Sequence, residues 1–428
     1  MITFYKIVTT LLYPFILILI FYRKILLKED PIRYKEKIFI KSFDVKKKKF
    51  KLIWFHAASI GEFKSILPLI KTLNEKNDNL EFLITTTTVS SGNLAVLELN
   101  KFKNTTHRFF PVDVNFIMEK FLFLWRPDII FLVDSEIWPN LILNAKKKGI
   151  PICLINARIT KKTFFRWKLI SKTANKIFKI FDLCLTSNLE TANYLKSFGA
   201  NNIYNLGNLK LTEQINVEEI QGINENFLKN NNFWCAVSTH DGEDDFFLKT
   251  HLEIKKVKKK IITVIAPRHI DRANKVKNLC DNYGLNSQIL NKNEKISDDK
   301  EIIIINSYGE LLIYFKFAKS VFLGKSLLKK FEETGGQSPI DAAKLGCAIY
   351  HGPYVYNFQE IYKLLDENKI SRETKNPVDL ANMVISNFDN NYKNQDRFSL
   401  LINNLGQQTL DGTIKKINKF LLNEKNKA

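Results

Sequence analysis

The order of apolar runs along the chain is its most restrictive feature. Short runs rich in β-branched residues alternate with segments of helical pattern over residues 51–156, and the alternation restarts over residues 233–350. Strands that alternate with helices form a parallel sheet with helices on both faces. We therefore expect two α/β domains in tandem. The length of 428 residues agrees, because one hydrophobic core rarely covers so long a chain.

The first residues have a different composition. Residues 7–22 are almost wholly apolar, and Lys6, Arg23 and Lys24 flank them. This run falls slightly short of the ~20 residues that span a bilayer. A signal peptide is an alternative, but a basic start and a small-residue cleavage site are both missing. The lysine-rich residues 46–51 then favour a cytoplasmic location for the rest of the chain. We expect a membrane anchor, either spanning or half-inserted.

Changes in composition suggest the domain boundaries. Residues 213–232 are rich in Asn and Glu with little periodicity, as in a linker. The predicted parts are a membrane anchor (1–22), a basic juxtamembrane linker (23–50), an N-terminal Rossmann-like domain (51–215), an interdomain linker (216–232), a C-terminal Rossmann-like domain (233–377) and C-terminal helices that pack back on the body (378–428).

The net charge of +21 favours an anionic partner, which could be a nucleic acid, a membrane surface or a phosphorylated substrate. A genome-wide bias toward lysine explains the charge equally well. A membrane-tethered nucleic-acid-binding protein is one hypothesis, but RNP, KH and zinc-finger signatures are absent from the sequence. The five cysteines are scattered without a CxxC pair, which argues against a zinc cluster or a disulfide framework.

Three motifs in the first half follow predicted strands, where ligands of parallel sheets bind. In WFHAASIGE, a helix is expected to start near Glu62, whose carboxylate would be kept ionised by the helix N-terminus and could act as a general base. A Ser59–Glu62 capping box is the competing interpretation. Glu136 in DSEIWPN could contact substrate or simply cap a helix. Lys210 in GNLK could neutralise a leaving phosphate or be a solvated surface lysine.

The second half contains further candidates. Arg268 in APRH could pair with a phosphate or carboxylate. The carboxylates of STHDGEDD (residues 238–245) could bind a metal, but an N-cap at Ser238 or Thr239 explains them better. Gly335 and Gly336 are expected to open a helix and present amides to a phosphate, while Asp341 could accept hydrogen bonds from ribose hydroxyls. Dinucleotide-binding and Walker-type motifs are absent from the sequence.

Taken together, and in this order, the motifs resemble the 3-deoxy-D-manno-octulosonic acid (Kdo) transferase family. The resemblance extends from the N-terminus to about Phe358. It rests on HAASIGE, DSEIWPN, NAR (156–158), GNLK, STHDGE, APRH, YGEL (308–311) and the block GGQSPIDAA…GPYVYNF.

The resemblance implies a GT-B fold, with two Rossmann-like domains facing a cleft, and an inverting, metal-independent glycosyltransferase without a cofactor. The donor would be CMP-Kdo and the acceptor a tetraacylated lipid A precursor, in lipopolysaccharide synthesis at the cytoplasmic face of the inner membrane. Nucleic acid is not an expected partner. Glu62 would be the proton acceptor, and Glu136 and Lys210 would stabilise the transition state. The residues expected to bind CMP are Pro267, Arg268, Tyr308, Gly309, Glu310, Ser338, Pro339, Ile340 and Asp341.

Several positions differ from the family pattern. Ser338 to Asp341 replaces a usual Asn-x-x-Glu, Gln337 and Tyr354 stand where histidines are common, and Asn306 replaces an expected Asp. These differences concern the donor side and leave Glu62 untouched. Another nucleotide-sugar transferase of the GT-B class is therefore the alternative hypothesis.

Overall fold

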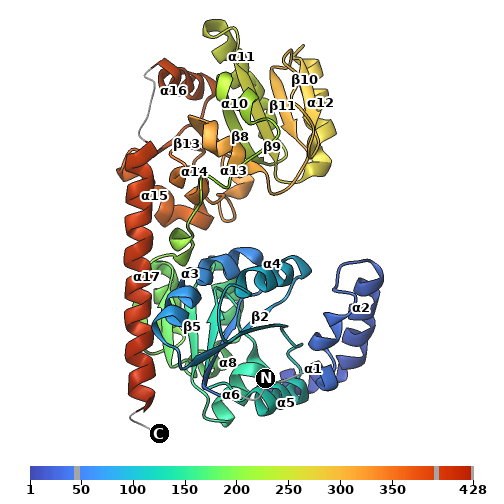
Figure 1. Ribbon diagram of the computed structural model, residues 1–428, viewed down its shortest axis with the longest axis vertical. Helices are drawn as coiled ribbons and strands as arrows, with labels where there is room; N and C mark the ends of the chain where they lie inside the picture. Colours follow the sequence, from blue (N-terminus) through green and yellow to red (C-terminus); the bar gives the residue numbers. More distant parts are fainter. Residues whose placement is uncertain (43–48, 390–394, 426–428) are drawn as a thin grey trace. The chain divides into compact units, whose positions relative to one another are not determined.

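The computed structural model describes residues 1–42, 49–389 and 395–425 (Figure 1). It divides into two compact units, one formed by Met1–Glu213 with Leu405–Ala428 and the other by Gln214–Asn404. Each unit contains a seven-stranded sheet, and all of its strands pair in parallel. The alternation of strands and helices expected from the sequence is therefore present twice. Part of the expected basic linker, residues 43–48, lies outside the described residues.

The sheet of the first unit has the order β3-β2-β1-β4-β5-β6-β7. Its strands are β1 (Lys51–His56), β2 (Leu80–Thr86), β3 (Thr105–Phe109), β4 (Ile129–Val133), β5 (Ile152–Ala157), β6 (Leu183–Thr186) and β7 (Ile203–Asn205). The helices that connect them are α3 (Ile60–Lys76), α4 (Val89–Leu99), α5 (Asn115–Trp125), α6 (Pro139–Lys147), α7 (Lys161–Lys168), α8 (Ser171–Phe178) and α9 (Leu189–Ser197).

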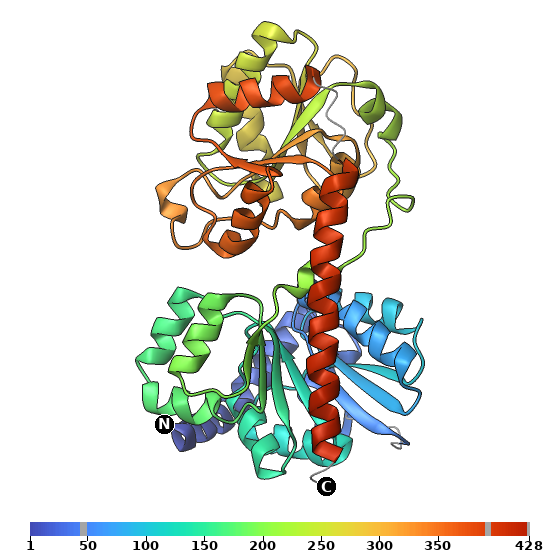
Figure 2. The same cartoon turned by 90° about the vertical axis from the view of Figure 1, so that its left-hand side faces the viewer.

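Helices bury both faces of this sheet. Trp54 and its neighbours on one face pack against α5, α6, α8 and α9. Phe55 and its neighbours on the other face pack against α3 and α4. The last long helix, α17 (Gln395–Lys425), also contributes Leu410, Ile414 and Ile417 to this second core. Figure 2 shows α17 lying over the strands of the first unit. Successive strand residues point to opposite faces, so a strand covered on both sides is apolar throughout.

The second unit has the strand order β10-β11-β9-β8-β12-β13-β14. Its strands are β8 (Phe233–Thr239), β9 (Ile262–Pro267), β10 (Ser287–Leu290), β11 (Ile302–Ile305), β12 (Ser320–Leu323), β13 (Ala348–His351) and β14 (Ser371–Glu373). Its α-helices are α10 (Glu225–Asn230), α11 (Asp244–Val257), α12 (Ala273–Asn282), α13 (Leu311–Phe317), α14 (Ile340–Lys344), α15 (Gln359–Glu367) and α16 (Pro377–Asp389). Short 3-10 turns lie at η3 (Leu209–Thr212) in the first unit and at η4 (Ile270–Arg272), η5 (Lys329–Phe331) and η6 (Tyr356–Phe358) in the second.

The interdomain linker expected at residues 216–232 is wrong in part, because this stretch belongs to the second unit and contains α10. Leu228 of α10 is buried, and Asn224 just before the helix accepts a hydrogen bond from the amide of Ile296. Most other side chains of this stretch are polar, so its hydrophobic pattern gave no sign of a packed helix.

The N-terminal residues form two helices, α1 (Ile2–Leu11) and α2 (Tyr13–Ile25), followed by η1 (Arg33–Lys37) and η2 (Ile40–Ser42). Among the described residues no single helix is long and apolar enough to cross a bilayer; α1 and α2, bent by 53°, meet the length and composition test only as a pair. The basic juxtamembrane linker predicted at residues 23–50 is wrong over its described part. Tyr34, Glu36 and Lys37 are buried there: Tyr34 packs against Ile20 and Ile38, Glu36 pairs with Arg33, and Lys37 pairs with Glu29.

Candidate active site

Glu62 lies at the first turn of α3, directly beyond the carboxyl end of β1. Its amide donates to Oγ of Ser59, the N-cap residue, over 3.3 Å. Its carboxylate accepts from the Ser59 hydroxyl at 3.0 Å and from the Ala58 amide at 2.7 Å. The capping interpretation is thus correct in outline, although the backbone amide that donates to the carboxylate is that of Ala58 and not that of Ser59. Capping and a catalytic role are compatible, since the cap fixes the direction of the carboxylate.

The electrostatic surroundings of Glu62 differ from the expectation. The pKa of Glu62 is raised to about 7: burial is the largest cause, the nearby carboxylates Asp134 and Glu136 add to it, and the bonds from Ala58 and Ser59 oppose it. The prediction that the helix N-terminus keeps this group firmly ionised is therefore wrong. A carboxylate with a pKa near neutrality can accept a proton at physiological pH, which suits a general base.

Glu136 follows β4 and is held by two donors. Its Oε2 lies 3.2 Å from Nε2 of His56 and accepts a 2.8 Å bond from the indole of Trp138. A carboxylate can only accept, so Nε2 of His56 carries the hydrogen of the first bond. Burial alone would raise the pKa of Glu136, but the hydrogen bond and charge of His56 and the bond from Trp138 bring it below its ordinary value. Glu136 therefore stays ionised beside a carboxyl that titrates near pH 7.

His56 is the last residue of β1 and has no exposed surface. Its ring stacks on Phe110 with centroids 3.7 Å apart, and Nδ1 lies 3.0 Å from the hydroxyl of Thr85 on β2. These contacts fix the ring plane, and with it the position of Glu136. His56 is thus a positioning residue that sequence reasoning did not select, although it is the first letter of the HAASIGE motif.

Lys210 reaches the same edge of the sheet from η3, which follows β7. Its Nζ lies 3.9 Å from Oδ2 of Asp134, the residue directly after β4. Burial raises the pKa of Asp134, while the charges of Lys210 and Arg158 oppose that rise. The turn itself is fixed by Asn156, whose side-chain oxygen accepts from the amide of Leu209 at 2.9 Å. The structure thus brings Glu62, Glu136 and Lys210 together, with Asp134 as an additional acidic group.

Helix α17 supports the turn that carries Lys210. Gly406 of α17 lies so close to this turn that a Cβ atom there would be 2.3 Å from the carbonyl oxygen of Leu211. A backbone atom cannot move aside as a side-chain end can, so the contact requires glycine. In contrast, a Cβ at Gly412 of the same helix would meet only Leu206, at an ordinary 3.7 Å.

We expect Gly406→Ala to lower stability by about 2 kcal/mol and to lower kcat, because η3 and Lys210 must shift to admit the methyl group. Gly412→Ala is the matched control, and it should be neutral or stabilising by up to ~1 kcal/mol, since alanine favours a helix. Denaturant unfolding and kcat, compared for the two variants, test this. Equal behaviour of both variants would contradict the proposed support of Lys210 by α17.

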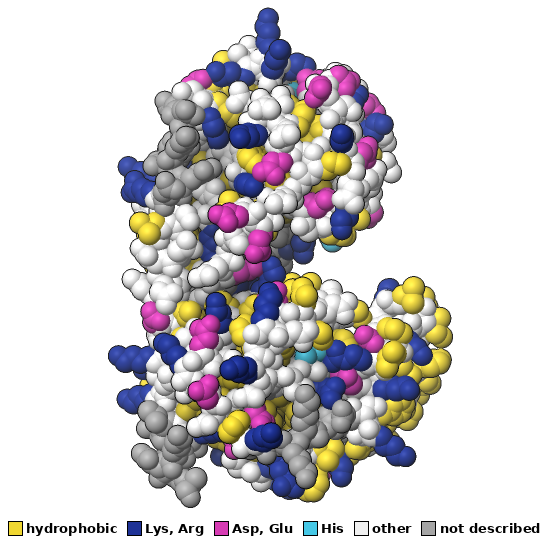
Figure 3. Space-filling view, in the orientation of Figure 1, with side chains coloured by type: hydrophobic (Ala, Val, Ile, Leu, Met, Phe, Trp, Pro, Cys, Tyr) yellow, Lys and Arg dark blue, Asp and Glu magenta, His cyan; other side chains and the backbone are white. Residues whose placement is uncertain are grey.

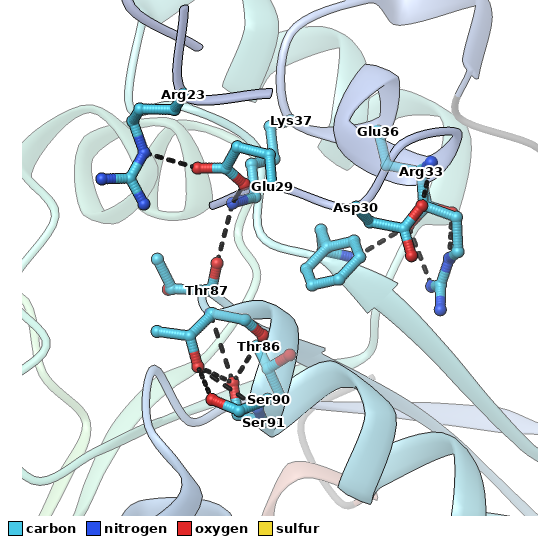
Figure 4. Close-up of polar contacts among 12 residues, drawn as sticks. Arg23, Glu29, Asp30, Arg33, Glu36, Lys37, Thr86, Thr87, Ser90 and Ser91 are labelled. Carbon is cyan, nitrogen blue, oxygen red and sulfur yellow. Dashed lines mark hydrogen bonds and ion pairs between the residues drawn. The ribbon is translucent and has the colours of Figure 1, made fainter. Parts of the chain in front are cut away.

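A chain of contacts links the N-terminal residues to the loop of Glu62, and Figure 4 shows its first part, from Arg23 to Thr87. Arg23 and Lys37 both pair with Glu29, and the Lys37 ammonium also donates to the carbonyl of Thr87 over 2.8 Å. The Thr87 amide donates to the carbonyl of Ala58 over 3.2 Å, and the Ala58 amide binds Glu62. The position of the Glu62 carboxylate therefore depends on a buried ion pair that joins α2 to the sheet.

The expected CMP-binding residues all belong to the second unit. Pro267 ends β9 and Arg268 follows it, while Tyr308 to Glu310 follow β11 and lead into α13. Ser338 to Asp341 lie at the start of α14, in the segment between β12 and β13. In a parallel sheet these positions share the carboxyl edge, where ligands bind. The side chain of Ile340 is buried, so only the backbone of Ile340 could contact a nucleotide.

The two glycines of the expected phosphate loop do not open a helix, since α14 begins at Ile340. Their amides are already bonded, from Gly335 to the carbonyl of Phe331 over 2.6 Å and from Gly336 to that of Lys325 over 2.8 Å. Close packing explains both glycines, because a Cβ at Gly335 would lie 2.2 Å from the carbonyl oxygen of Tyr354. A phosphate-binding role for these amides stays a prediction. It requires both amides to break these hydrogen bonds and to donate to the phosphate instead.

The acidic run 238–245 is explained by internal contacts. Helix α11 begins at Asp244 with Glu243 at the N-cap, so the N-cap predicted at Ser238 or Thr239 is wrong by several residues. Asp241 pairs with Lys275, Asp244 with Arg272 and Asp245 with Lys249. Among the described residues, no group of three or more His, Cys, Asp or Glu side chains could hold a metal ion.

Comparison with known proteins decides the family. Residues 33–213 match the family model described as 3-deoxy-D-manno-octulosonic-acid transferase (kdotransferase). The chain is 29% identical to 3-deoxy-D-manno-octulosonic acid transferase of Rickettsia bellii, over 98% of this chain and 100% of that protein. It is 30% identical to the transferase of the same name from Rickettsia typhi, over 78% of this chain and 71% of that protein. The chain belongs to the Kdo transferase family.

The family assignment makes the protein a glycosyltransferase, as the sequence motifs predicted. A Kdo transferase of Haemophilus influenzae is a more distant relative, 25% identical over 84% of this chain and 86% of its own length. Among solved structures, the UDP-N-acetylglucosamine 2-epimerase of Neisseria meningitidis has a TM-score of 0.58 at 12% identity, covering 87% of this chain and 100% of its own. At this identity the likeness concerns the fold alone, which is the two-unit α/β design of GT-B proteins.

The residues that the sequence did not single out in this Kdo transferase share one property. Each supports a candidate residue without being a candidate itself: His56 and Trp138 bond to Glu136, Thr85 bonds to His56, and Asn156 bonds to the turn that carries Lys210. Except for Trp138, these residues are distant in the chain from the candidate that they support. Three of these residues, His56, Trp138 and Asn156, lie within the motifs HAASIGE, DSEIWPN and NAR, which was their only signal in the sequence. Thr85 lies in none of the motifs.

Proposed function

We propose that this Kdo transferase uses CMP-Kdo as donor and a tetraacylated lipid A precursor, lipid IVA, as acceptor. The acceptor hydroxyl attacks the anomeric carbon of Kdo, and Glu62 takes the hydroxyl proton. The bond from that carbon to the phosphate oxygen breaks, and CMP leaves with the bonding electrons. Attack opposite to the leaving group inverts the anomeric centre. The observation that carries the base role is the Glu62 carboxyl at the carboxyl end of β1, held by Ala58 and Ser59 beside Glu136 and Asp134, with a pKa of about 7 that suits proton transfer at neutral pH.

The other groups stabilise charge in this scheme. Ionised Glu136 stabilises the positive charge that develops on the sugar ring, and the Lys210 ammonium stabilises the negative charge of the departing phosphate. No metal or other cofactor takes part. Donor binding falls to the second unit, through Pro267, Arg268, Tyr308, Gly309, Glu310, Ser338, Pro339, Ile340 and Asp341. Family membership supports these roles, and so does the placement of these residues at the carboxyl edges of the two sheets.

The test is an assay of detergent-solubilised protein with CMP-Kdo generated in situ and lipid IVA. The expected product has the mass of the acceptor plus one or more Kdo units, and its yield should be unchanged by a metal chelator after donor synthesis is complete. A parallel panel of other nucleotide sugars addresses the alternative donor. Product from another nucleotide sugar, and none from CMP-Kdo, would overturn the donor assignment while keeping the transferase class.

We also propose that α1 and α2 hold the protein on the cytoplasmic face of the inner membrane. One side of this pair is docked on the first unit, through Tyr5, which donates to Asp113, and Tyr13, which donates to the carbonyl of Ile38. The other side is exposed and apolar, and Figure 3 shows the hydrophobic side chains gathered over α2. These exposed residues include Phe4, Ile7, Leu11, Phe15, Ile18, Leu19, Phe21 and Ile25. A patch of this kind beside basic residues suits an anionic bilayer.

We expect Phe15→Ser combined with Ile18→Ser to reduce binding to anionic lipid vesicles by at least about 10-fold, since each side chain contributes ~2 kcal/mol when buried in lipid. Both side chains are about two-thirds exposed, so the fold should tolerate the change. Leu97→Ser, at a similarly exposed position on α4, is the control. Flotation of the purified protein with vesicles measures the effect, and unchanged flotation of the double variant would contradict the assignment of this surface.

A further inference from the structure

Two cations flank β8 at the carboxyl edge of the second sheet. Arg268 directly follows β9 and Lys325 follows β12, and both strands pair with β8. Backbone bonds hold the three strand ends together, from the Arg268 amide to the carbonyl of Thr239 over 3.0 Å and from the Gly324 amide to that of Val237 over 2.9 Å. In the part of the chain that the structure describes, neither cation has an ion-pair partner.

Lys325 has a backbone conformation that lysine rarely adopts. Its φ is 58°, in the left-handed region, where a Cβ atom is crowded. Ser238, near the end of the neighbouring strand β8, has a φ of 55°. Strained positions of this kind persist where the surrounding structure enforces them, and they concentrate at binding sites. Two questions follow: which contacts enforce the conformation of Lys325, and what the lysine binds.

Glu243 supplies the structural cause. This carboxylate is fully buried, and its two oxygens accept four backbone amides. Oε2 accepts from Lys325 at 2.7 Å and from His240 at 2.9 Å, while Oε1 accepts from Ser326 at 2.9 Å and from Leu327 at 3.1 Å. The loops after β8 and β12 are therefore locked to each other, and Lys325 and His240 are held beside Arg268.

Neither the Lys325 ammonium nor the Arg268 guanidinium forms an ion pair among the described residues, because the nearby Glu243 carboxylate binds backbone amides instead. Burial lowers the pKa of Lys325, and the positive charge of Arg268 lowers it further. His240 lies with its ring 5.9 Å from that of His269. Burial likewise lowers the pKa of His240; the bond to the Ser238 carbonyl and the charge of Glu243 oppose this, and the charges of Lys325 and His269 add to it. Like charges that a fold brings together without a counterion are stabilised when an anion binds between them.

We infer that Lys325 and Arg268, with His240 beside them, form a binding site for a phosphate group in which Lys325 is a further donor-binding residue. The inference rests on the proposed function in one respect, since the phosphate would be that of CMP-Kdo. A lysine supplies a point charge and an arginine a planar pair of donors, a combination suited to a phosphate group. Side chains take this role because the amides of Gly335 and Gly336 are bonded within the chain.

The test compares the binding of CMP and cytidine to the full-length protein in detergent by calorimetry. Lys325→Asn removes the charge and keeps a residue that tolerates the left-handed conformation. We expect a loss in CMP affinity on the order of 10-fold or more, as for a charged hydrogen bond, with cytidine affinity unchanged. Lys325→Arg should retain most of the CMP affinity. Lys329→Asn, an equal charge change at an exposed position of the same loop, is the control.

The outcomes separate this site from the identity of the donor. Equal CMP affinity of wild type and Lys325→Asn would overturn the inference, as would equal affinity of the wild type for CMP and cytidine. The affinities for UMP and UDP are measured as well, to test which nucleotide the donor contains. If a uridine nucleotide binds more tightly than CMP and that advantage depends on Lys325, the phosphate site stands and CMP-Kdo fails as the donor. Thermal unfolding of each variant confirms that it is folded.

Discussion

Glu62→Gln is expected to lower kcat by ~10²- to 10⁴-fold, the range in which general bases contribute. The amide is isosteric and can still accept from the Ala58 amide, so the loop should keep its shape. In the wild type, kcat/KM should fall about tenfold per pH unit below the Glu62 pKa of about 7, because only the carboxylate can take the proton. Initial rates between pH 5 and 9 measure both effects, and Glu75→Gln, on an exposed position of α3, is the control.

Although Glu62→Gln lowers activity, it should make the protein more stable relative to the wild type as the pH rises. The folded-state pKa of Glu62, about 7, lies above its ordinary value of 4.5, so folding favours the protonated form. That contribution is complete below about pH 4.5 and is lost as pH rises through about 7. Gln does not titrate, so only the wild type loses this contribution. The free energy of unfolding of the variant, relative to that of the wild type, should therefore rise by about 2 kcal/mol from pH 5 to pH 8. Denaturant unfolding at the two pH values tests this, and a pH-independent difference would refute the raised pKa.

Lys37→Met is expected to lower stability by about 3 kcal/mol, because it leaves the buried carboxylate of Glu29 with only Arg23 as a partner. Both Glu29 and Lys37 are almost fully buried. Replacing both members of a buried pair costs much less than breaking it. The double variant Glu29→Gln, Lys37→Met should therefore recover most of the loss in denaturant unfolding. Lys35→Met, two residues away and exposed, should have no effect.

The double variant also tests the link from α2 to the active site. It lacks the bond from Lys37 to the carbonyl of Thr87, so the loop of Ala58 loses one support. We expect kcat to drop by about 10-fold while stability is near that of the wild type, since small misplacements of a catalytic group are costly. A double variant with normal kcat would show that the ion pair matters for folding alone. The donor KM should be unchanged, because the donor-binding residues lie in the other unit.

Much of the fold could be predicted because strands buried on both faces are apolar throughout. The strand Ile129–Val133, for example, is a fully apolar run followed by a helix that begins at Pro139. β3 lacks this signal for the complementary reason. It is an edge strand of the first sheet, and its residues Thr105, Thr106 and Arg108 are only partly buried, so it lacks an apolar run. β14, at one edge of the second sheet, was missed for the same reason.

The candidate residues could also be predicted, since a short motif after a strand lies at the carboxyl edge of a parallel sheet. Glu62, Glu136 and Arg268 follow β1, β4 and β9 as expected. The state of these residues could not be predicted in the same way. The pKa of Glu62 depends first on burial and then on Asp134 and Glu136, which are far away in the chain but close in space. The helix N-terminus, which lowers such a pKa, can be predicted from the local sequence. The burial that raises the pKa cannot, because it depends on the folded chain.

The sequence by itself determined the two α/β units, the placement of the motifs at strand ends and the family, because these depend on local pattern and on the order of motifs. Only the tertiary structure decided that residues 23–50 are partly a packed segment, that Gly335 and Gly336 have bonded amides, and that Lys325 stands beside Arg268. Each of these depends on contacts between distant residues. A buried ion pair such as Glu29 with Lys37 looks like solvated charge in a sequence, since burial and partners arise only when the chain is folded.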